Sequence, residues 1–381
     1  MKIRCFILCL TLLIALQYSR CQNTSQVSTS STLENGDEED SSESPKDLTG
    51  LLVIRMSLKQ MKILEKLKEL ELSVSDIFNC FAVISNLAIM LTIRRYKSSS
   101  VPRVYMSALA LCDFGVGVCA LIKSVQDRTL CLPEIYRSTV CKYTYWSVFG
   151  LEASASMSAA LIAMFLSIDR CIALQKPFTY HLICTVRKAM ALSISVIITN
   201  LLVCINYPFR IQVNEDSDDD QNKYVFSQYT EFGRIETYKK LFTSYEFLLR
   251  FAVPLCVMTI TNTWTIFILQ GNTRRRKTLS AKAKEPPKIK YLTTTVGVVA
   301  IFFVTQLTRA AYLTDTLING NAHRGKYATE MISLFGSLVA RFNSIVNIFI
   351  YVILDKEFRR MLINLIFCRR LDQPNANQQE T

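Results

Sequence analysis

Long apolar segments alternate with short polar ones along most of this chain. Seven of these segments reach the length of about 20 residues that a helix needs to cross the hydrocarbon core of a bilayer. They cover residues 72–95, 104–125, 143–168, 189–209, 247–270, 291–315 and 331–353. The pattern predicts an all-α membrane protein in which residues 71–354 form a seven-transmembrane helix bundle.

The first 70 residues have a different pattern. Lys2 and Arg4 precede an apolar stretch, residues 5–16, that is too short to span a bilayer, so residues 1–21 are interpreted as a signal peptide, with an uncleaved anchor as the alternative. Residues 22–70 are expected to form an extracellular tail. Its first part is rich in Ser, Thr, Glu and Asp and predicts disorder, with a glycosylation sequon at Asn23. Its last part predicts an interfacial helix or a solvated helix leading into the first span.

The segment after the last span, residues 355–381, predicts an amphipathic helix followed by a cytoplasmic tail. Phe358, Leu362, Leu365 and Ile366 share one face, opposite the arginines, as in a helix that lies on the inner membrane surface. Cys368 follows this helix and is either a palmitoylation site or a free thiol.

The distribution of charge gives the orientation of the bundle. The chain has 381 residues and a net charge of +13, and its basic residues cluster at positions 94–97, 187–188 and 274–277, in the loops predicted to be cytoplasmic. An acidic run at 215–220 lies in a predicted outer loop. This asymmetry predicts a plasma-membrane protein with an extracellular N-terminus, and it argues against nucleic acid as the partner.

Catalytic motifs are missing from the sequence. It contains no GxSxG, HExxH or phosphate-binding loop, and no CxxC pair or histidine cluster that indicates a metal site. An enzyme is therefore not expected. A membrane transporter is the remaining alternative class, but internal repeats and broken helices in matching halves are not seen.

Several polar residues lie inside the predicted spans, where they are costly. Asn86, Asp113, Asn343 and Asn347 fall at compatible depths in three spans. Such a cluster indicates a hydrated site that can hold a cation or relay protons. A hydrogen-bonded network that only packs the helices is the alternative.

Five motifs, in order and at matching depths, resemble those of the rhodopsin-like (class A) G-protein-coupled receptors. They are Asn86, Leu109-Ala110-Leu111-Cys112-Asp113, Asp169-Arg170-Cys171, Pro254 and Asn347-Ile348-Phe349-Ile350-Tyr351. A finer resemblance, to invertebrate FMRFamide-type neuropeptide receptors, rests on Pro254 followed by Asn262, on Asn343-Ser344 and on Phe358-Arg359.

The resemblance implies a receptor that binds an extracellular ligand, here a neuropeptide, and activates a heterotrimeric G protein. It implies roles in coupling and activation for Asp169, Arg170, Asn262, Asn347 and Tyr351. It also implies that Asp113, Asn343 and Asn347, next to Asn86, hold a structural sodium ion in the resting state.

The chain also departs from the family pattern. Lys288 stands where the acidic partner of Arg170 is expected, Thr308 and Gln306 replace a proline and a tryptophan, and Ile348 replaces a second proline. These departures predict altered activation mechanics. The usual outer-loop cysteine is missing from residues 205–255, so a disulfide between Cys131 and Cys141 is the candidate instead.

Three charges in the outer half of the bundle mark the expected ligand site. Glu152 lies eighteen residues before Arg170, which places it on the same helix face about 27 Å nearer the outside. The resemblance groups Glu152, Arg309 and Arg341 around the ligand cavity, with Glu152 facing Arg341, and we add Gln306 and Tyr312. An internal ion pair that only fixes the helices is the alternative.

The charges leave the ligand class open. A basic amidated peptide would place its cation on Glu152, beneath the acidic loop. A surplus of arginine instead suits a carboxylate, and a chemosensory receptor of the same fold for a small anionic molecule is the alternative function.

Overall fold

The computed structural model describes residues 58–96, 99–129, 139–215, 225–279, 314, 327–354 and 356–367. Several predictions lie outside these ranges. They are the signal peptide, the sequon at Asn23, the cysteines Cys131 and Cys368, and the ligand-site residues Gln306, Arg309 and Tyr312; of Cys141 only the backbone is described, so the disulfide is not tested.

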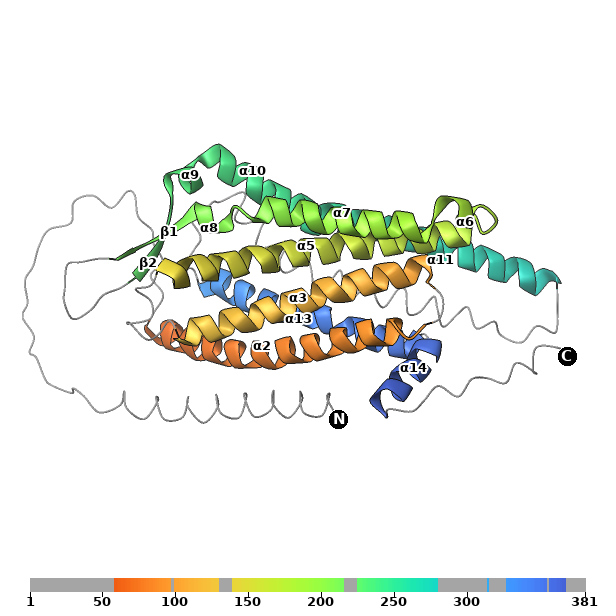
Figure 1. Cartoon of the computed structure of the whole chain (residues 1–381), viewed down its shortest axis with the longest axis horizontal. Helices are drawn as coiled ribbons and strands as arrows, with labels where there is room; N and C mark the ends of the chain where they lie inside the picture. The colour runs from red at the N-terminus through yellow and green to blue at the C-terminus, as the bar shows by residue number, and fades with distance from the viewer. Residues whose placement is uncertain are drawn as a thin grey trace, which may run out of the picture. The chain divides into compact units, whose positions relative to one another are not determined.

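Helices make up most of the described structure (Figure 1). In chain order they are α2 (Leu58–Ile93), α3 (Val101–Thr129), α5 (Thr139–Gln175), α6 (Tyr180–Ile183), α7 (Val186–Cys204), α8 (Tyr207–Arg210), α9 (Glu231–Arg234), α10 (Glu236–Phe247), the π-helix η1 (Leu248–Ala252), α11 (Val253–Leu279), α13 (Tyr327–Leu354) and α14 (Lys356–Ile366).

Six segments of the described chain are long and apolar enough to cross a membrane. They are Lys62–Ile93, Val101–Gln126, Thr144–Gln175, Val186–Arg210, Glu236–Ile268 and Leu334–Ile353. Each matches one predicted span, and the predicted span at 291–315 lies outside the described residues apart from Thr314, which is helical. The first helix begins at Leu58, so it runs without a break from the predicted tail into the first span.

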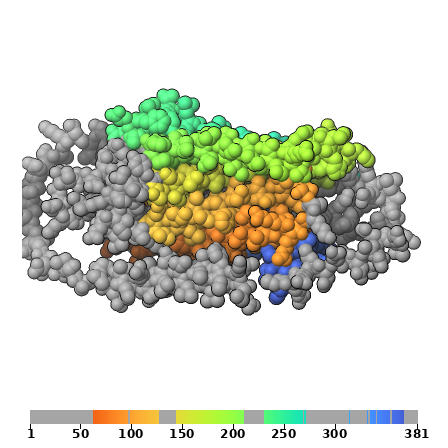
Figure 2. Space-filling model, in the orientation of Figure 1, coloured from red at the N-terminus to blue at the C-terminus, as the bar shows by residue number. Residues whose placement is uncertain are grey.

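The bundle is organised around α5, which packs against α3, α7, η1 and α11, while α2 packs against α3 and α13. Tyr105 of α3, Ile162 of α5 and Ala189 of α7 share one buried apolar cluster. On the face shown in Figure 2, α7 lies along α5 and α3. Large apolar side chains such as Leu202 and Phe267 are 63% and 64% exposed, as expected for surfaces that face lipid.

A glycine permits the closest of these helix contacts. A Cβ atom added to Gly150 of α5 would lie 2.7 Å from the carbonyl oxygen of Cys204 and 3.2 Å from Cβ of Tyr207. Because a backbone carbonyl cannot move aside cheaply, only glycine fits here. The backbone of α5 thus approaches the backbone of α7 at Cys204 and the side chain of Tyr207 in α8.

The all-α prediction holds for the bundle but missed a β-hairpin. Strands β1 (Ile211–Glu215) and β2 (Val225–Tyr229) pair antiparallel, with Ile211 opposite Tyr229. They follow α8 and precede α9. The hairpin therefore belongs to the connection between the fourth and fifth predicted spans, where the acidic run begins.

The amphipathic helix predicted after the last span is α14. Its Phe358 is fully buried and joins Ile89 and Ala110 in an apolar cluster, together with Leu362 and Leu365. The residues that pattern analysis placed on one face of the helix are thus the ones that attach it to α2 and α13, with the exception of Ile366, which is 65% exposed.

Candidate ligand site and activation network

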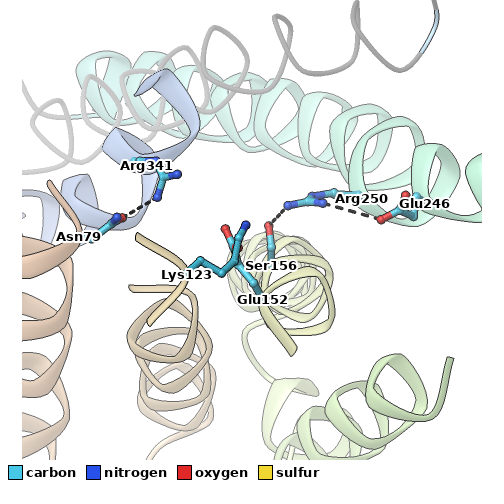
Figure 3. A network of polar contacts seen from close by, with 7 residues as sticks. All are labelled: Asn79, Lys123, Glu152, Ser156, Glu246, Arg250 and Arg341. Carbon is cyan, nitrogen blue, oxygen red and sulfur yellow. Dashed lines mark hydrogen bonds and ion pairs between the residues drawn. The ribbon is translucent and has the colours of Figure 1, made fainter. Parts of the chain in front are cut away.

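Charged and polar side chains from α2, α3, α5, η1 and α13 project toward one another in the interior of the bundle (Figure 3). At the centre, Lys123 Nζ of α3 lies 2.7 Å from Glu152 Oε2 of α5, and the two side chains are only 16% and 17% exposed. Lys123 also lies over the ring of Phe149, 4.5 Å from its centroid. The lysine is therefore held by a carboxylate and an aromatic face at once.

The second cation of this region, Arg250, lies where α10 passes into α11. The wider turn of η1 brings Arg250 and Phe251 into the interior, where they are 5% and 1% exposed. Arg250 Nη2 donates to Ser156 Oγ at 2.6 Å, and its Nη1 is 4.0 Å from Glu246 Oε1. The same Glu246 oxygen accepts a hydrogen bond from the hydroxyl of Tyr207 at 2.8 Å. Arg250 thus shares its glutamate with a tyrosine.

The third cation of this region is Arg341 of α13. Its Nη1 donates to Asn79 Oδ1 of α2 at 2.9 Å. One turn of helix further out, Glu71 accepts hydrogen bonds from both Ser75 and Ser337 and so also joins α2 to α13. Among the described residues, Arg341 is therefore held by a neutral amide and not by a carboxylate.

The structure brings two of the five predicted ligand-site residues, Glu152 and Arg341, into this polar cluster. In the described structure Lys123 forms an ion pair with Glu152, and Asn79 accepts a hydrogen bond from Arg341. Sequence reasoning missed Lys123 and Arg250. Both are charged residues inside predicted spans, so the cost of burying a charge would have marked them too.

A second polar network occupies the middle of the bundle. Asp113 of α3 is 3% exposed, and its two carboxylate oxygens accept hydrogen bonds from Ser344 Oγ at 3.1 Å and Asn347 Nδ2 at 2.7 Å. Asn86 donates to the carbonyl oxygen of Ser344 at 3.0 Å. The network therefore ties α2 and α3 to α13. Ser344, and not the predicted Asn343, supplies the second bond to Asp113.

The predicted sodium ion would need oxygen ligands, and the groups at Asp113 include oxygen atoms. No cationic side chain pairs with this buried carboxylate in the part of the chain that the structure describes. A buried negative charge without a counter-charge is costly, so a monovalent cation or a proton would stabilise it. Asp113, the hydroxyl of Ser344 and the amide oxygen of Asn347 are the groups that would hold the cation.

The inner end of α5 carries the predicted coupling residues. Asp169 is buried and accepts a hydrogen bond from the hydroxyl of Tyr180 at 2.9 Å, whereas Arg170 is exposed. Burial, together with the carboxylate that accepts this bond, raises the pKa of Tyr180 above its usual range, so the phenol remains a donor. The inner loop is thereby fastened to α5 next to Arg170.

Two further predicted activation residues have local partners. Asn262 Nδ2 donates to the carbonyl oxygen of Met258 on its own helix at 2.7 Å. The ring of Tyr351 meets that of Phe358 edge-on, with centroids 5.7 Å apart. Tyr351 therefore connects the end of α13 to the membrane-surface helix α14.

Residues 85–351 match the family model described as the 7 transmembrane receptor (rhodopsin family). Because this match covers more than half of the chain, the chain belongs to the rhodopsin family of seven-transmembrane receptors. It is a multi-pass membrane receptor and not an enzyme.

Two relatives add detail. The chain is 23% identical to an FMRFamide receptor of Drosophila melanogaster over 323 residues, which cover 80% of this chain and 56% of the relative. It is 26% identical to G-protein coupled receptor 68 of Bos taurus over 164 residues, which cover 40% of this chain and 43% of the relative. The chain thus spans about half the length of each relative.

Proposed function

We propose that this chain is a plasma-membrane receptor with an extracellular N-terminus, which binds a peptide at the outer polar cluster and activates a heterotrimeric G protein. The observation that carries the proposal is that helix α5 has polar residues that make side-chain contacts toward both of its ends. Glu152 and Ser156 of α5 belong to the polar residues labelled in Figure 3, which we call the outer cluster. Asp169 and Arg170 lie near the other end of the same helix.

A ligand bound among the outer charges would act on the whole bundle. The ion pair from Lys123 to Glu152 joins α3 to α5, and Arg341 joins α13 to α2. A ligand that prefers one arrangement of these contacts shifts the equilibrium between two packings of the helices. The Asp113 network, which ties α3 to α13 below, and the α5 helix itself would carry that shift to Arg170.

The similarity to an FMRFamide receptor favours a peptide over other ligands. The acidic run at 215–220 begins at the end of β1 and would attract a basic peptide body. A peptide cation that binds Glu152 must displace Lys123, because this lysine already neutralises the carboxylate.

The test is a cell assay of the full chain with peptides ending in Arg-Phe-amide, reading calcium and cyclic AMP. Glu152→Gln should lose the response at matched surface expression. Glu236→Gln is the matched control, since Glu236 is 82% exposed, pairs only with Lys240 among the described residues and lies outside the cluster. Arg170→Ala should bind the same peptide without signalling.

Surface labelling of a tag placed after residue 22, without permeabilising the cells, checks the location and the orientation. Absence of any response to peptides, at good surface expression, contradicts a peptide receptor. It would favour the second candidate, a receptor for a small anion, which the cations Lys123, Arg250 and Arg341 support.

A further inference from the structure

Arg341 differs from Lys123 and Arg250, the other two cations of the outer cluster, in having no carboxylate partner among the residues that the structure describes. Lys123 lies 2.7 Å from Glu152, and Arg250 lies 4.0 Å from Glu246. Within the described ranges Arg341 has one hydrogen-bond partner, the amide oxygen of Asn79. Among the described residues, Lys123 and Arg250 therefore each lie near a glutamate, whereas the hydrogen bond of Arg341 is to an amide.

The free edge of this guanidinium can be identified. Asn79 Oδ1 accepts from Nη1, while Nε is shielded from solvent and meets no acceptor among the described residues. A guanidinium binds a carboxylate best through two parallel N–H groups, and Nε together with Nη2 forms one such edge. Asn79, itself 3% exposed, fixes the plane of the guanidinium. Its bond uses only Nη1, so the Nε–Nη2 edge is available for a second acceptor.

Arg341 is partly buried, with its Nε shielded from solvent. The most effective partner of such a cation is an anion that also fills its hydrogen bonds. We propose that Arg341, oriented by Asn79, is the subsite for a carboxylate of the ligand, which the Nε–Nη2 edge binds with two hydrogen bonds. The proposal deepens the proposed function, because it rests on the outer cluster being the ligand site.

The shielding of Nε links this subsite to conformational change. A carboxylate reaches the edge only when the packing around Arg341 opens, and Arg341 and Asn79 join α13 to α2. The acid group would therefore select a packing of these helices that differs from the one described here. This makes it a group that drives the response and does not only add affinity.

The carboxylate has three possible sources: a free peptide C-terminus, an acidic peptide side chain, or a small carboxylic acid. The probes are therefore a set of short peptides, each as free acid and as amide, with and without an internal Asp or Glu, and a panel of C2–C6 mono- and dicarboxylic acids. The readouts are signalling in cells and the thermal shift of the purified full chain, which rises when a ligand binds the folded state.

Arg341→Gln should lower the potency of the active acid about 100-fold, as expected when one partner of a buried charge pair is removed. Arg341→Lys keeps the charge but not the fork and should recover only part of this loss. The matched control is Lys240→Gln, which removes an exposed outer cation, 71% accessible, and should leave the potency unchanged. If no acid in either panel gives a response or shift that depends on Arg341, the proposal is overturned.

A second measurement needs no agonist. Asn79→Asp places a carboxylate at the 2.9 Å contact and so gives Arg341 a counter-charge from the protein itself. The ligand-free receptor should then melt at a higher temperature than the wild type, and its response to acids should fall. Asn79→Ala removes the contact without adding charge and should lower the melting temperature. Equal destabilisation by both variants would show that Arg341 does not lack a counter-charge.

The outcomes separate this inference from the proposed function. An amidated peptide that acts equally on the wild type and Arg341→Gln supports the peptide receptor and overturns the carboxylate subsite. A small acid that acts through Arg341 while every peptide is silent supports the subsite and contradicts the peptide receptor.

Discussion

Lys123 and Glu152, 29 residues apart in the chain, form an ion pair of 2.7 Å between the outer parts of α3 and α5. Both side chains are more than four-fifths buried, so the pair is exposed to little screening. The pair neutralises the one carboxylate that sequence analysis assigned to a ligand cation. If a ligand cation binds Glu152 as proposed, it must therefore compete with Lys123.

Breaking this pair from either side should be costly. Lys123→Met or Glu152→Gln should each lower the stability of the receptor by about 3 kcal/mol, because each leaves a buried charge without its partner. The double variant should recover most of this loss. Thermal unfolding of the four purified proteins gives the coupling energy, and additive losses in the double variant would show that the two side chains act independently.

The contact at Gly150 offers a prediction with an internal control. Gly150→Ala should destabilise the bundle by about 1–3 kcal/mol, because the new methyl group would meet the Cys204 carbonyl at 2.7 Å. Gly271→Ala, in a helix with no atom within 4 Å of the added Cβ, should be neutral or stabilising by up to about 1 kcal/mol. Surface expression and melting temperature measure both, and equal effects would contradict the close approach of α5 to α7.

Helix α14 should be held by its apolar face and not by its ion pair. Phe358 is fully buried, whereas the bridge from Arg103 to Glu357 spans 3.2 Å with Glu357 58% exposed. Phe358→Ala is expected to cost about 3–5 kcal/mol, and Glu357→Gln no more than about 1 kcal/mol. Thermal unfolding compares the two. A larger loss in Glu357→Gln would mean that the charge fixes the helix.

The apolar pattern was enough to predict the described spans and α14, because lipid and the core impose long apolar stretches that are visible in one sequence. It could not predict the hairpin of β1 and β2. Their sequences, IQVNE and VFSQY, contain β-branched and aromatic residues, but each strand is only five residues long and the acidic run beside them favoured a solvated loop.

The sequence predicted where the charged residues of the site lie along the bundle, but not which side chains they contact. Helical spacing from Arg170 placed Glu152, and the family resemblance placed Arg341, around the cavity. Which cation reaches Glu152 depends on helix rotation and depth, which spacing does not determine. The inward turn of Arg250 depends on the π-helix η1, a local widening with no sequence signal of its own. Asn343 and Ser344 lie four and three residues before Asn347, so both fall near its helix face, and spacing does not determine that Ser344 reaches Asp113.

The Asp113 network gives the test of the sodium prediction. In this network a buried carboxylate receives only two neutral hydrogen bonds among the described residues, from Ser344 and Asn347. A sodium ion bound there would stabilise the receptor, so replacing potassium by sodium at constant ionic strength should raise its melting temperature.

Asp113→Asn should abolish this dependence on sodium, because a neutral amide does not neutralise the charge of a bound cation. The amide has a similar shape to the carboxylate, so the helices should stay in place. Ser344→Ala should weaken the dependence and not remove it, since the carboxylate stays. The control is Asn262→Ala, whose amide bonds only its own helix in the described structure and should leave the sodium effect intact. A sodium effect that persists in Asp113→Asn would place the cation elsewhere, and the network would then serve only to pack α3 against α13.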